Sequence, residues 1–189
     1  MPIPYRVVAF AGSLRQASFN RALLRAAVEL APPRLAIEVH DLIEVPVFNE
    51  DVEAVGDPPA VARLKAAIGA ADGLLIVTPE YNHGPSGVTK NAVDWLSRPA
   101  RGSVLRGRPA AILGASMGST GTARAQSALR QSFVFTDTPA MLQPEFLLAR
   151  AQEKFDADGR LTDETSRRYL GRFLESFADW ITRLVGDPG

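Results

Sequence analysis

The sequence predicts a three-layer α/β fold, in which one parallel β-sheet lies between two layers of helices. Short apolar runs alternate along the chain with longer amphipathic segments. Continuous apolar runs are typical of parallel strands that are buried on both faces. Because right-handed crossovers connect such strands, the intervening helices are expected to cover both faces of the sheet. The chain has 189 residues, and we expect residues 1–189 to form a single domain.

The strands are expected where apolar side chains follow one another. Residues 6–11 (RVVAFA) end at Gly12, and residues 73–78 (GLLIVT) are apolar and become β-branched toward their end. Three further strands are expected at residues 35–40, 110–115 and 141–148, the last in one piece or two. Five strands in a chain of this length favour the flavodoxin-like strand order 2-1-3-4-5 over a six-stranded arrangement. The predicted fold class is therefore a flavodoxin-like sandwich.

The helices are expected between the strands, where apolar residues recur every three or four positions. The first is stopped by Pro32 and Pro33, which cannot continue a helix. The last is expected to be capped by Thr162 and to carry one long apolar stripe. Residues 46–59 are expected to form a polar connection. The predicted helices are residues 18–31, 60–71, 88–98, 122–134 and 162–184.

The composition excludes several kinds of chemistry. The chain has no Cys, so it has no disulfide, no thiol nucleophile and no Cys-ligated metal centre. His40 and His83 are its two histidines, too few for a three-His metal site, and no metal ion is expected. Because 21 basic and 21 acidic residues give no net charge, neither nucleic acid nor a membrane is expected as a partner. No apolar segment approaches the ~20 residues of a membrane span, and we expect a cytoplasmic protein.

The loop after the first strand has the composition of a phosphate site. In sheets of this topology the ligand lies beyond the carboxyl ends of the strands, where the strand order reverses. The polar groups at that point belong to Ser13, Arg15, Ser18 and Asn20. They lie near the first turn of a helix, whose free N–H groups and dipole attract anions. The alternative is that Ser18 is an ordinary N-cap and Arg15 a solvated charge.

The loop after the third strand is expected to be rigid and to border a planar ring. It contains Pro79, Glu80, Tyr81 and Asn82, followed by two glycines and a second proline before the next helix. Exposed backbone groups beside an aromatic side chain suit the edge of a planar heterocycle. The alternative is an ordinary turn with Tyr81 and Trp95 as core aromatics, and for Trp95 the core is favoured.

The loop after the fourth strand contains Gly-x-Ser-x-Gly, with Ser116 at its centre and Gly118 at its end. Between a strand and a helix, this pattern is typical of a hydrolase nucleophile. That hypothesis requires a histidine after the serine, whereas His40 and His83 both precede Ser116. Backbone packing of this loop against a flat ring is the preferred interpretation.

Three motifs in these loops are similar to those of a known family. They are Gly12-Ser13-Leu14-Arg15-x2-Ser18-x-Asn20, Pro79-Glu80-Tyr81-Asn82 leading to residues 87–97 (GVTKNAVDWLS), and residues 114–126 (GASMGSTGTARAQ). With them the chain resembles the NAD(P)H-dependent FMN reductases, a flavodoxin-like family that includes bacterial chromate, quinone and azo-dye reductases.

The resemblance implies a flavin pocket built from the three loops. It implies that the FMN phosphate is bound by Ser13, Arg15, Ser18 and Asn20. It implies that the isoalloxazine ring is bordered by Pro79, Glu80, Tyr81 and Asn82 and approached by Ser116 and Gly118. The sequence departs from common family versions over residues 83–87 (HGPSG), which bear on substrate preference.

The activity implied by the resemblance is hydride transfer from NADH or NADPH to bound FMN. The electrons then pass to a small acceptor of the quinone, flavin, azo or chromate type. The flavin N5 carries this chemistry, so no catalytic side chain is expected. The resemblance also implies a homodimer or a homotetramer.

A flavodoxin-type electron carrier, which binds FMN without being an enzyme, is the alternative. Such carriers usually have a strongly acidic surface and a Thr-rich phosphate loop. The zero net charge and Arg15 favour the enzyme.

Overall fold

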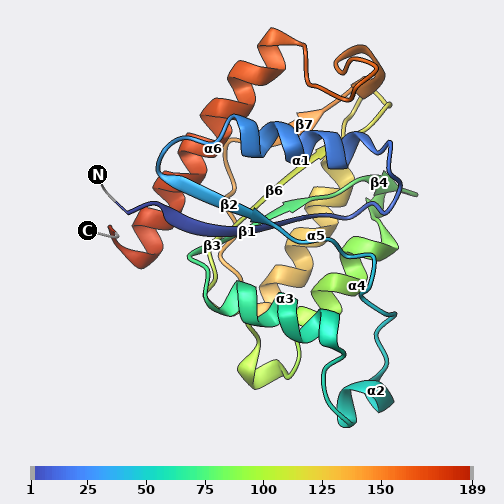
Figure 1. The fold of residues 1–189 in the computed structure, drawn as a ribbon, viewed down its shortest axis with the longest axis vertical. Helices are drawn as coiled ribbons and strands as arrows, with labels where there is room; N and C mark the ends of the chain where they lie inside the picture. The colour runs from blue at the N-terminus through green and yellow to red at the C-terminus, as the bar shows by residue number, and fades with distance from the viewer. Residues whose placement is uncertain (1–2, 188–189) are drawn as a thin grey trace.

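A five-stranded parallel sheet forms the centre of the computed structural model, which describes residues 3–187 (Figure 1). The strand order is β2-β1-β3-β6-β7, which confirms the predicted topology. Residues 1–2 and 188–189, the ends of the predicted domain, lie outside the described residues. The strands are β1 (Tyr5–Ala11), β2 (Leu35–Val39), β3 (Gly73–Val77), β6 (Ala110–Ala115) and β7 (Phe146–Leu148).

Helices cover both faces of the sheet, as expected. On one face lie α1 (Phe19–Glu29) and α6 (Glu164–Val185), whose core side chains include Leu23, Phe173 and Phe177. The other face is covered by α3 (Pro59–Gly69), α4 (Gly87–Leu96) and α5 (Ala123–Thr136). Leu64, Ile68 and Phe133 belong to this second core. The apolar stripes of the helices therefore produce two separate cores, one on each side of the sheet.

Most element boundaries differ from the prediction by one or two residues, and two differences are informative. The prediction that Thr162 caps the last helix is wrong, because the N-cap is Asp163, whose Oδ2 accepts from the Ser166 N–H at 2.8 Å. The hydroxyl of Thr162 instead donates to the Lys154 carbonyl. Hydrogen bonds from Ser166 and Lys154 hold the pKa of Asp163 below its usual value. The last strand is also shorter than predicted, and Ala140 makes only an isolated bridge to Ala110.

Short elements occur in segments where no regular structure was predicted. The connection over residues 46–59 contains α2 (Glu50–Ala54), which begins because the Asn49 side chain accepts from the Asp51 N–H. A small hairpin of β4 (Glu80–Tyr81) and β5 (Gly84–Pro85) follows β3. Two single-turn 3₁₀ helices complete the described part, η1 (Ala100–Gly102) and η2 (Ala151–Glu153).

The sheet itself fixes where three loops start. Beyond the strand ends, hydrogen bonds continue from the Gly12 N–H to the Val77 carbonyl and from the Thr78 N–H to the Leu113 carbonyl. The Ser116 N–H likewise donates to the Leu148 carbonyl. The loops after β1, β3 and β6 therefore leave the same edge of the sheet from neighbouring, hydrogen-bonded positions. Among residues 3–187, no helix has the length and apolarity required to cross a membrane.

Candidate functional site

The loop after β1 leaves the sheet at a point that accepts only glycine. A Cβ atom on Gly12 would lie 1.7 Å from the Thr89 Oγ1 and 3.0 Å from the Ser86 Oγ. The Ser86 hydroxyl donates to the Gly12 carbonyl at 2.6 Å. Gly12 thus allows the loop after β1 to touch the segment that leads into α4.

The start of α1 presents polar groups that have no partner in the described part of the chain. Ser18 is the N-cap, and its Oγ accepts from the Asn20 N–H at 3.2 Å. The Ser13 hydroxyl and the Arg15 guanidinium make no hydrogen bond or ion pair with residues 3–187, nor do the backbone N–H groups of residues 13–17. Ser13 is buried, whereas residues 14–17 are exposed. Free N–H groups, a hydroxyl and a cation at a helix N-terminus form a donor set suited to an anion.

Asn20 is occupied by a different contact. Its Nδ2 donates to the Ala115 carbonyl at 2.9 Å, and its Oδ1 accepts from the Ala115 N–H at the same distance. The side chain is buried and joins the start of α1 to the end of β6. Asn20 therefore joins the start of α1 to the end of β6, whereas the sequence suggested a direct contact with phosphate.

The segment after β3 folds into the β4–β5 hairpin. Its two turn residues, Asn82 and His83, have positive φ angles of 50° and 63°. A two-residue connection with both φ angles positive is a type I′ turn, which matches the twist of a hairpin. Pro79 is buried beneath it, whereas Tyr81 is 59% exposed and so is not a core aromatic.

Glu80 is directed away from the solvent and toward α5. Its Oε2 accepts from the N–H groups of Arg124 and Ala125, both at 3.0 Å. The side chain is 9% exposed, and its other oxygen lies 3.8 Å from the Arg124 guanidinium. A carboxylate at this place satisfies two free N–H groups and the positive end of the helix dipole. Glu80 therefore joins the hairpin to the start of α5.

A buried hydroxyl cluster holds the base of the hairpin. The Thr89 Oγ1 lies 2.9 Å from the Ser86 Oγ and 3.0 Å from the Thr78 Oγ1. The Ser86 Oγ also caps α4 by accepting from the Thr89 N–H. Because Ser86 contacts Gly12 as well, the cluster joins the loops after β1 and β3.

The loop after β6 is shaped by glycines and by backbone contacts. A Cβ on Gly114 would lie 2.2 Å from the Thr78 carbonyl oxygen, so a larger residue does not fit. The Ser116 Oγ accepts from the Gly118 N–H at 3.1 Å, while the Gly118 carbonyl accepts from the Arg150 N–H. Ser116 is thus engaged in a local turn, and Gly118 lies exposed in the same turn.

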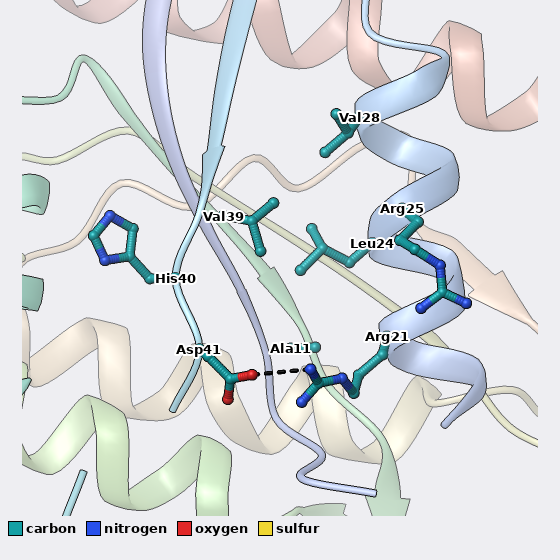
Figure 2. A pocket seen from close by; sticks show the side chains of 8 residues that line it. All are labelled: Ala11, Arg21, Leu24, Arg25, Val28, Val39, His40 and Asp41. Carbon is teal, nitrogen blue, oxygen red and sulfur yellow. Dashed lines mark hydrogen bonds and ion pairs between the residues drawn. The ribbon is translucent and has the colours of Figure 1, made fainter. Parts of the chain in front are cut away.

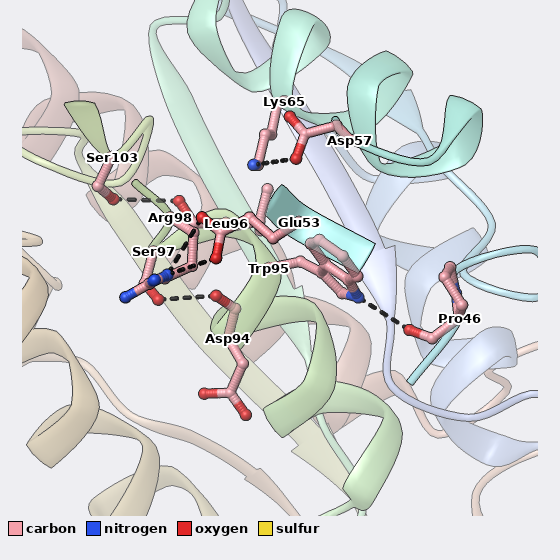
Figure 3. Close-up of polar contacts among 10 residues, drawn as sticks. All are labelled: Pro46, Glu53, Asp57, Lys65, Asp94, Trp95, Leu96, Ser97, Arg98 and Ser103. Carbon is pink, nitrogen blue, oxygen red and sulfur yellow. Dashed lines mark hydrogen bonds and ion pairs between the residues drawn. The ribbon is translucent and has the colours of Figure 1, made fainter. Parts of the chain in front are cut away.

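Residues 87–97, the second half of the motif that follows β3, have a structural role. Figure 3 shows Trp95 of α4 directed toward Pro46, whose carbonyl accepts from the indole Nε1 at 2.9 Å. Trp95 has no exposed surface, which confirms the prediction that it is a core aromatic. Arg98 follows the same helix and binds Glu53 of α2 at 2.9 Å. These contacts hold the connection between β2 and α3 against α4.

Sequence patterns missed three of these ties, those of Glu80, Asn20 and Ser86. Each joins residues that are distant in the chain, so no local spacing signals them. One indirect signal exists at α5, which lacks an acidic residue in its first turn and whose N-cap, Thr122, makes no side-chain cap bond. The first turn of α5 therefore has N–H groups that are open to a carboxylate from elsewhere in the chain.

A separate groove of about 380 Å³ lies between α1 and the end of β2 (Figure 2). Leu24, Val28 and Val39 give it an apolar lining, and Arg21 pairs with Asp41 at 2.9 Å. None of the predicted site residues lines this groove. The candidate site is assigned to the three joined loops, which carry the predicted site residues. Among residues 3–187, no group of three or more His, Asp or Glu residues is arranged to hold a metal ion.

Comparisons with known proteins agree on one family. Residues 5–153 match the family model described as NADPH-dependent FMN reductase. The chain is 49% identical over 181 residues to an NAD(P)H-dependent FMN reductase of Pseudomonas aeruginosa, covering 96% of this chain and 97% of the relative. It is 43% identical to a 2-hydroxy-1,4-benzoquinone reductase of a Burkholderia species, covering 93% and 96%. The solved structure of FerB, an NAD(P)H:(acceptor) oxidoreductase flavoenzyme of Paracoccus denitrificans, superposes with a TM-score of 0.87 at 37% identity, covering 95% and 98%.

Proposed function

This chain belongs to the NADPH-dependent FMN reductase family, and we propose that it transfers electrons from a nicotinamide through FMN to a quinone. It is an enzyme of the NAD(P)H-dependent FMN and quinone reductase type, with FMN as cofactor and NAD(P)H as electron donor. Quinones are proposed as acceptors because relatives covering nearly the whole chain are named quinone reductases. Flavin, azo and chromate-type acceptors are outcomes that the assay below distinguishes.

The residues at the start of α1 fit the phosphate of FMN. Ser13, Arg15 and the N–H groups of residues 13–17 have no partner within residues 3–187, and all are donors. A phosphate monoester accepts several such bonds at once, and an Arg guanidinium matches its oxygens in pairs. Ser18 would add its hydroxyl while it caps the helix. This free donor set is the observation that carries the proposal.

Asn20 would act through position rather than contact. Both ends of its carboxamide pair with Ala115, so the residue fixes the start of α1 relative to the loop after β6. The phosphate donors then stand at a constant distance from the loop that would border the ring. We therefore propose that Asn20 keeps the two ends of the cofactor site at a fixed distance from each other.

The other two loops would border the isoalloxazine ring. Pro79, Tyr81 and Asn82 form one side, with their backbone and one exposed aromatic side chain. Ser116 and Gly118 would form the other side. When bound, FMN supplies the hydride-accepting and hydride-donating chemistry. The protein then binds and orients the nicotinamide and the acceptor, and no side-chain acid or base is assigned.

Arginine 15 provides the sharpest test. We expect Arg15→Ala to weaken FMN binding about 10- to 100-fold, because a charge-assisted hydrogen bond contributes about 1.5–3 kcal/mol. Riboflavin lacks the phosphate, so its affinity should remain unchanged. Fluorescence titration of the apoprotein measures both affinities, and Arg101→Ala, another exposed arginine without an ion pair in residues 3–187, is the control.

Equal affinity of Arg15→Ala and the unaltered protein for FMN would contradict the phosphate assignment. Oxidation of NADH and NADPH with a benzoquinone, free FMN, an azo dye or chromate as acceptor tests the reaction itself. Rapid turnover with the quinone supports the proposal, and turnover only with another acceptor would replace the quinone by that class. Reduction of the bound flavin without turnover would indicate an electron carrier instead.

We also propose that the protein is a cytoplasmic homodimer or homotetramer. The connection between β2 and α3 exposes four apolar side chains, those of Ile43, Val47, Val52 and Val55. Apolar side chains gathered on one surface segment are typical of a protein contact. Sedimentation velocity of the unaltered protein and of Val47→Asp measures the oligomeric state, and monomers in both samples would contradict the proposal.

A further inference from the structure

The β4–β5 hairpin is too short to be stable by its own contacts. Each strand has only two residues, and Pro85 in β5 has no N–H group to donate. The turn places His83 at a φ of 63°, a conformation in which a residue with a Cβ is strained. Even longer isolated hairpins are only marginally stable in water. The geometry of this hairpin must therefore come from its anchors.

One anchor is the bond from Glu80 to α5. The helix does not cap itself, because the Thr122 hydroxyl accepts from the Gln126 Nε2 at 3.0 Å and Thr122 makes no side-chain cap bond. The N–H groups of Arg124 and Ala125 are satisfied by the Glu80 carboxylate. Both strands of the hairpin also pack against α5. The carboxylate is thus the polar contact that fixes the distance between the hairpin and the helix.

The second anchor directly follows the second strand and lies at the same base of the hairpin, because Glu80 pairs with Pro85. There Ser86 binds the Gly12 carbonyl and joins the buried hydroxyl cluster with Thr89. Between the two anchors lie Tyr81, Asn82 and His83, all exposed, followed by Gly84 and Pro85, both half-buried. Loss of Glu80 would leave Ser86 as the remaining polar anchor, with the packing against α5 no longer fixed by a polar contact.

We propose that Glu80 is a positioning residue that sets the pose of the hairpin against the ring-binding part of the site, without contacting the cofactor phosphate. This inference rests on the proposed function, because it assigns the hairpin to the ring. It predicts that Glu80 contributes to the affinity for the ring and that Arg15 contributes to the affinity for the phosphate. The two contributions are separable by comparing FMN with riboflavin.

The first experiment measures binding of both flavins to the apoprotein of Glu80→Ala. We expect FMN and riboflavin to bind about tenfold more weakly, the order of effect that follows loss of one charge-assisted hydrogen bond. The ratio of the two affinities should stay at its original value. The visible circular dichroism of the bound flavin should change, because the ring environment is altered. Glu80→Gln, which keeps an acceptor oxygen without the charge, should recover part of the lost affinity.

Asp163→Ala is the matched control. Asp163 caps α6 through the same type of bond, from its carboxylate to a backbone N–H at 2.8 Å, and α6 does not belong to the three loops. Its loss should lower stability by a similar amount without changing either flavin affinity. Equal losses of flavin affinity in Asp163→Ala and Glu80→Ala would overturn the proposal, since general instability would explain both. A loss confined to FMN in Glu80→Ala would overturn it too, because Glu80 would then act on the phosphate.

The second experiment needs no flavin. Hydrogen–deuterium exchange of the apoprotein reports how often the amides of residues 80–86 open. We expect faster exchange in Glu80→Ala than in the unaltered protein, and unchanged exchange of this segment in Asp163→Ala. Unchanged exchange in Glu80→Ala would overturn the positioning role. Failure of the unaltered protein to bind flavin would instead contradict the proposed function, and exchange would still decide the role of Glu80.

Discussion

The loop after β1 and the β4–β5 hairpin lie at the same edge of the sheet, yet they use their polar groups in opposite ways. In the loop, Ser13 and Arg15 have no partner within residues 3–187. In the hairpin segment, Glu80 is engaged in a contact with α5 and Ser86 in a contact with the loop after β1. The hairpin therefore exposes mainly backbone and the ring of Tyr81, whereas the loop exposes donors.

This difference suits two kinds of recognition. A phosphate is recognised by directed donors that have no competing partner, and a helix N-terminus supplies them with little rearrangement. A flat ring is recognised by a surface of fixed shape, which requires the side chains behind it to be immobile. The two regions share one cofactor only if they stay in register. The contact between Gly12 and Ser86 joins these two regions, while Asn20 joins the start of α1 to the end of β6.

The largest expected effect comes from Gly12→Ala, which disrupts both regions at their junction. The new Cβ would overlap the Thr89 Oγ1, and that hydroxyl is fixed by its contacts with Thr78 and Ser86. Overpacking of this kind lowers the free energy of unfolding by about 1–3 kcal/mol or more. Urea unfolding measures the loss, and FMN and riboflavin should both bind poorly.

Gly87→Ala is the control for this substitution. Gly87 begins α4, and a Cβ at this position meets no atom within 4 Å. In a helix, Ala is favoured over Gly, so no loss of stability is expected. Equal behaviour of the two alanine variants would show that close contact at Gly12 does not determine the register.

The sequence predicted the sheet well because its signals are local. Continuous apolar runs such as those of β1 and β3 require a buried strand wherever they occur. The five parallel strands and their helices followed from such runs and from the crossover rule. The start of α1 also followed from a local signal, since Ser18 is an ordinary N-cap residue and does cap the helix.

The ties between the loops could not be predicted in the same way. The Glu80 carboxylate reaches Arg124, 44 residues away, and Asn20 reaches Ala115 across 95 residues. The residue types of the partners, Arg124 and Ala115, do not distinguish them from other arginines and alanines of the chain. The hairpin was also missed, because its turn lacks the glycine that usually follows Asn and its strands are too short for a periodic pattern. Family resemblance marked these residues as important but assigned them to the cofactor.

A second prediction separates a tie from a free donor within the same loop. Asn20→Ala removes two buried hydrogen bonds and leaves both backbone groups of Ala115 unpaired, which should lower the unfolding free energy by about 1–3 kcal/mol. Ser13→Ala removes a hydroxyl without a partner in residues 3–187, so stability should change by less than about 0.5 kcal/mol. FMN affinity should fall about fivefold in Ser13→Ala.

Thermal unfolding and FMN titration of the two variants give the comparison directly. Asn20→Ala is expected to lose stability even in the apoprotein, and Ser13→Ala only cofactor affinity. If Ser13→Ala destabilised the apoprotein and Asn20→Ala did not, the assignment of ties and free donors would be reversed.

The smallest effect is expected at the tip of the hairpin, from His83→Gly. A residue with a Cβ loses about 1–2 kcal/mol in the left-handed region, while glycine loses about 0.5–1 kcal/mol of backbone entropy, so a gain of roughly 0.5 kcal/mol remains. Asn82→Gly is the control, because Asn tolerates the same conformation better than His. Chemical denaturation of both variants measures the difference. A gain in His83→Gly together with unchanged flavin affinity would mean that the anchors, rather than the turn, hold the hairpin against the site. A loss of flavin affinity in His83→Gly would place the imidazole itself among the groups that contact the ring or the acceptor.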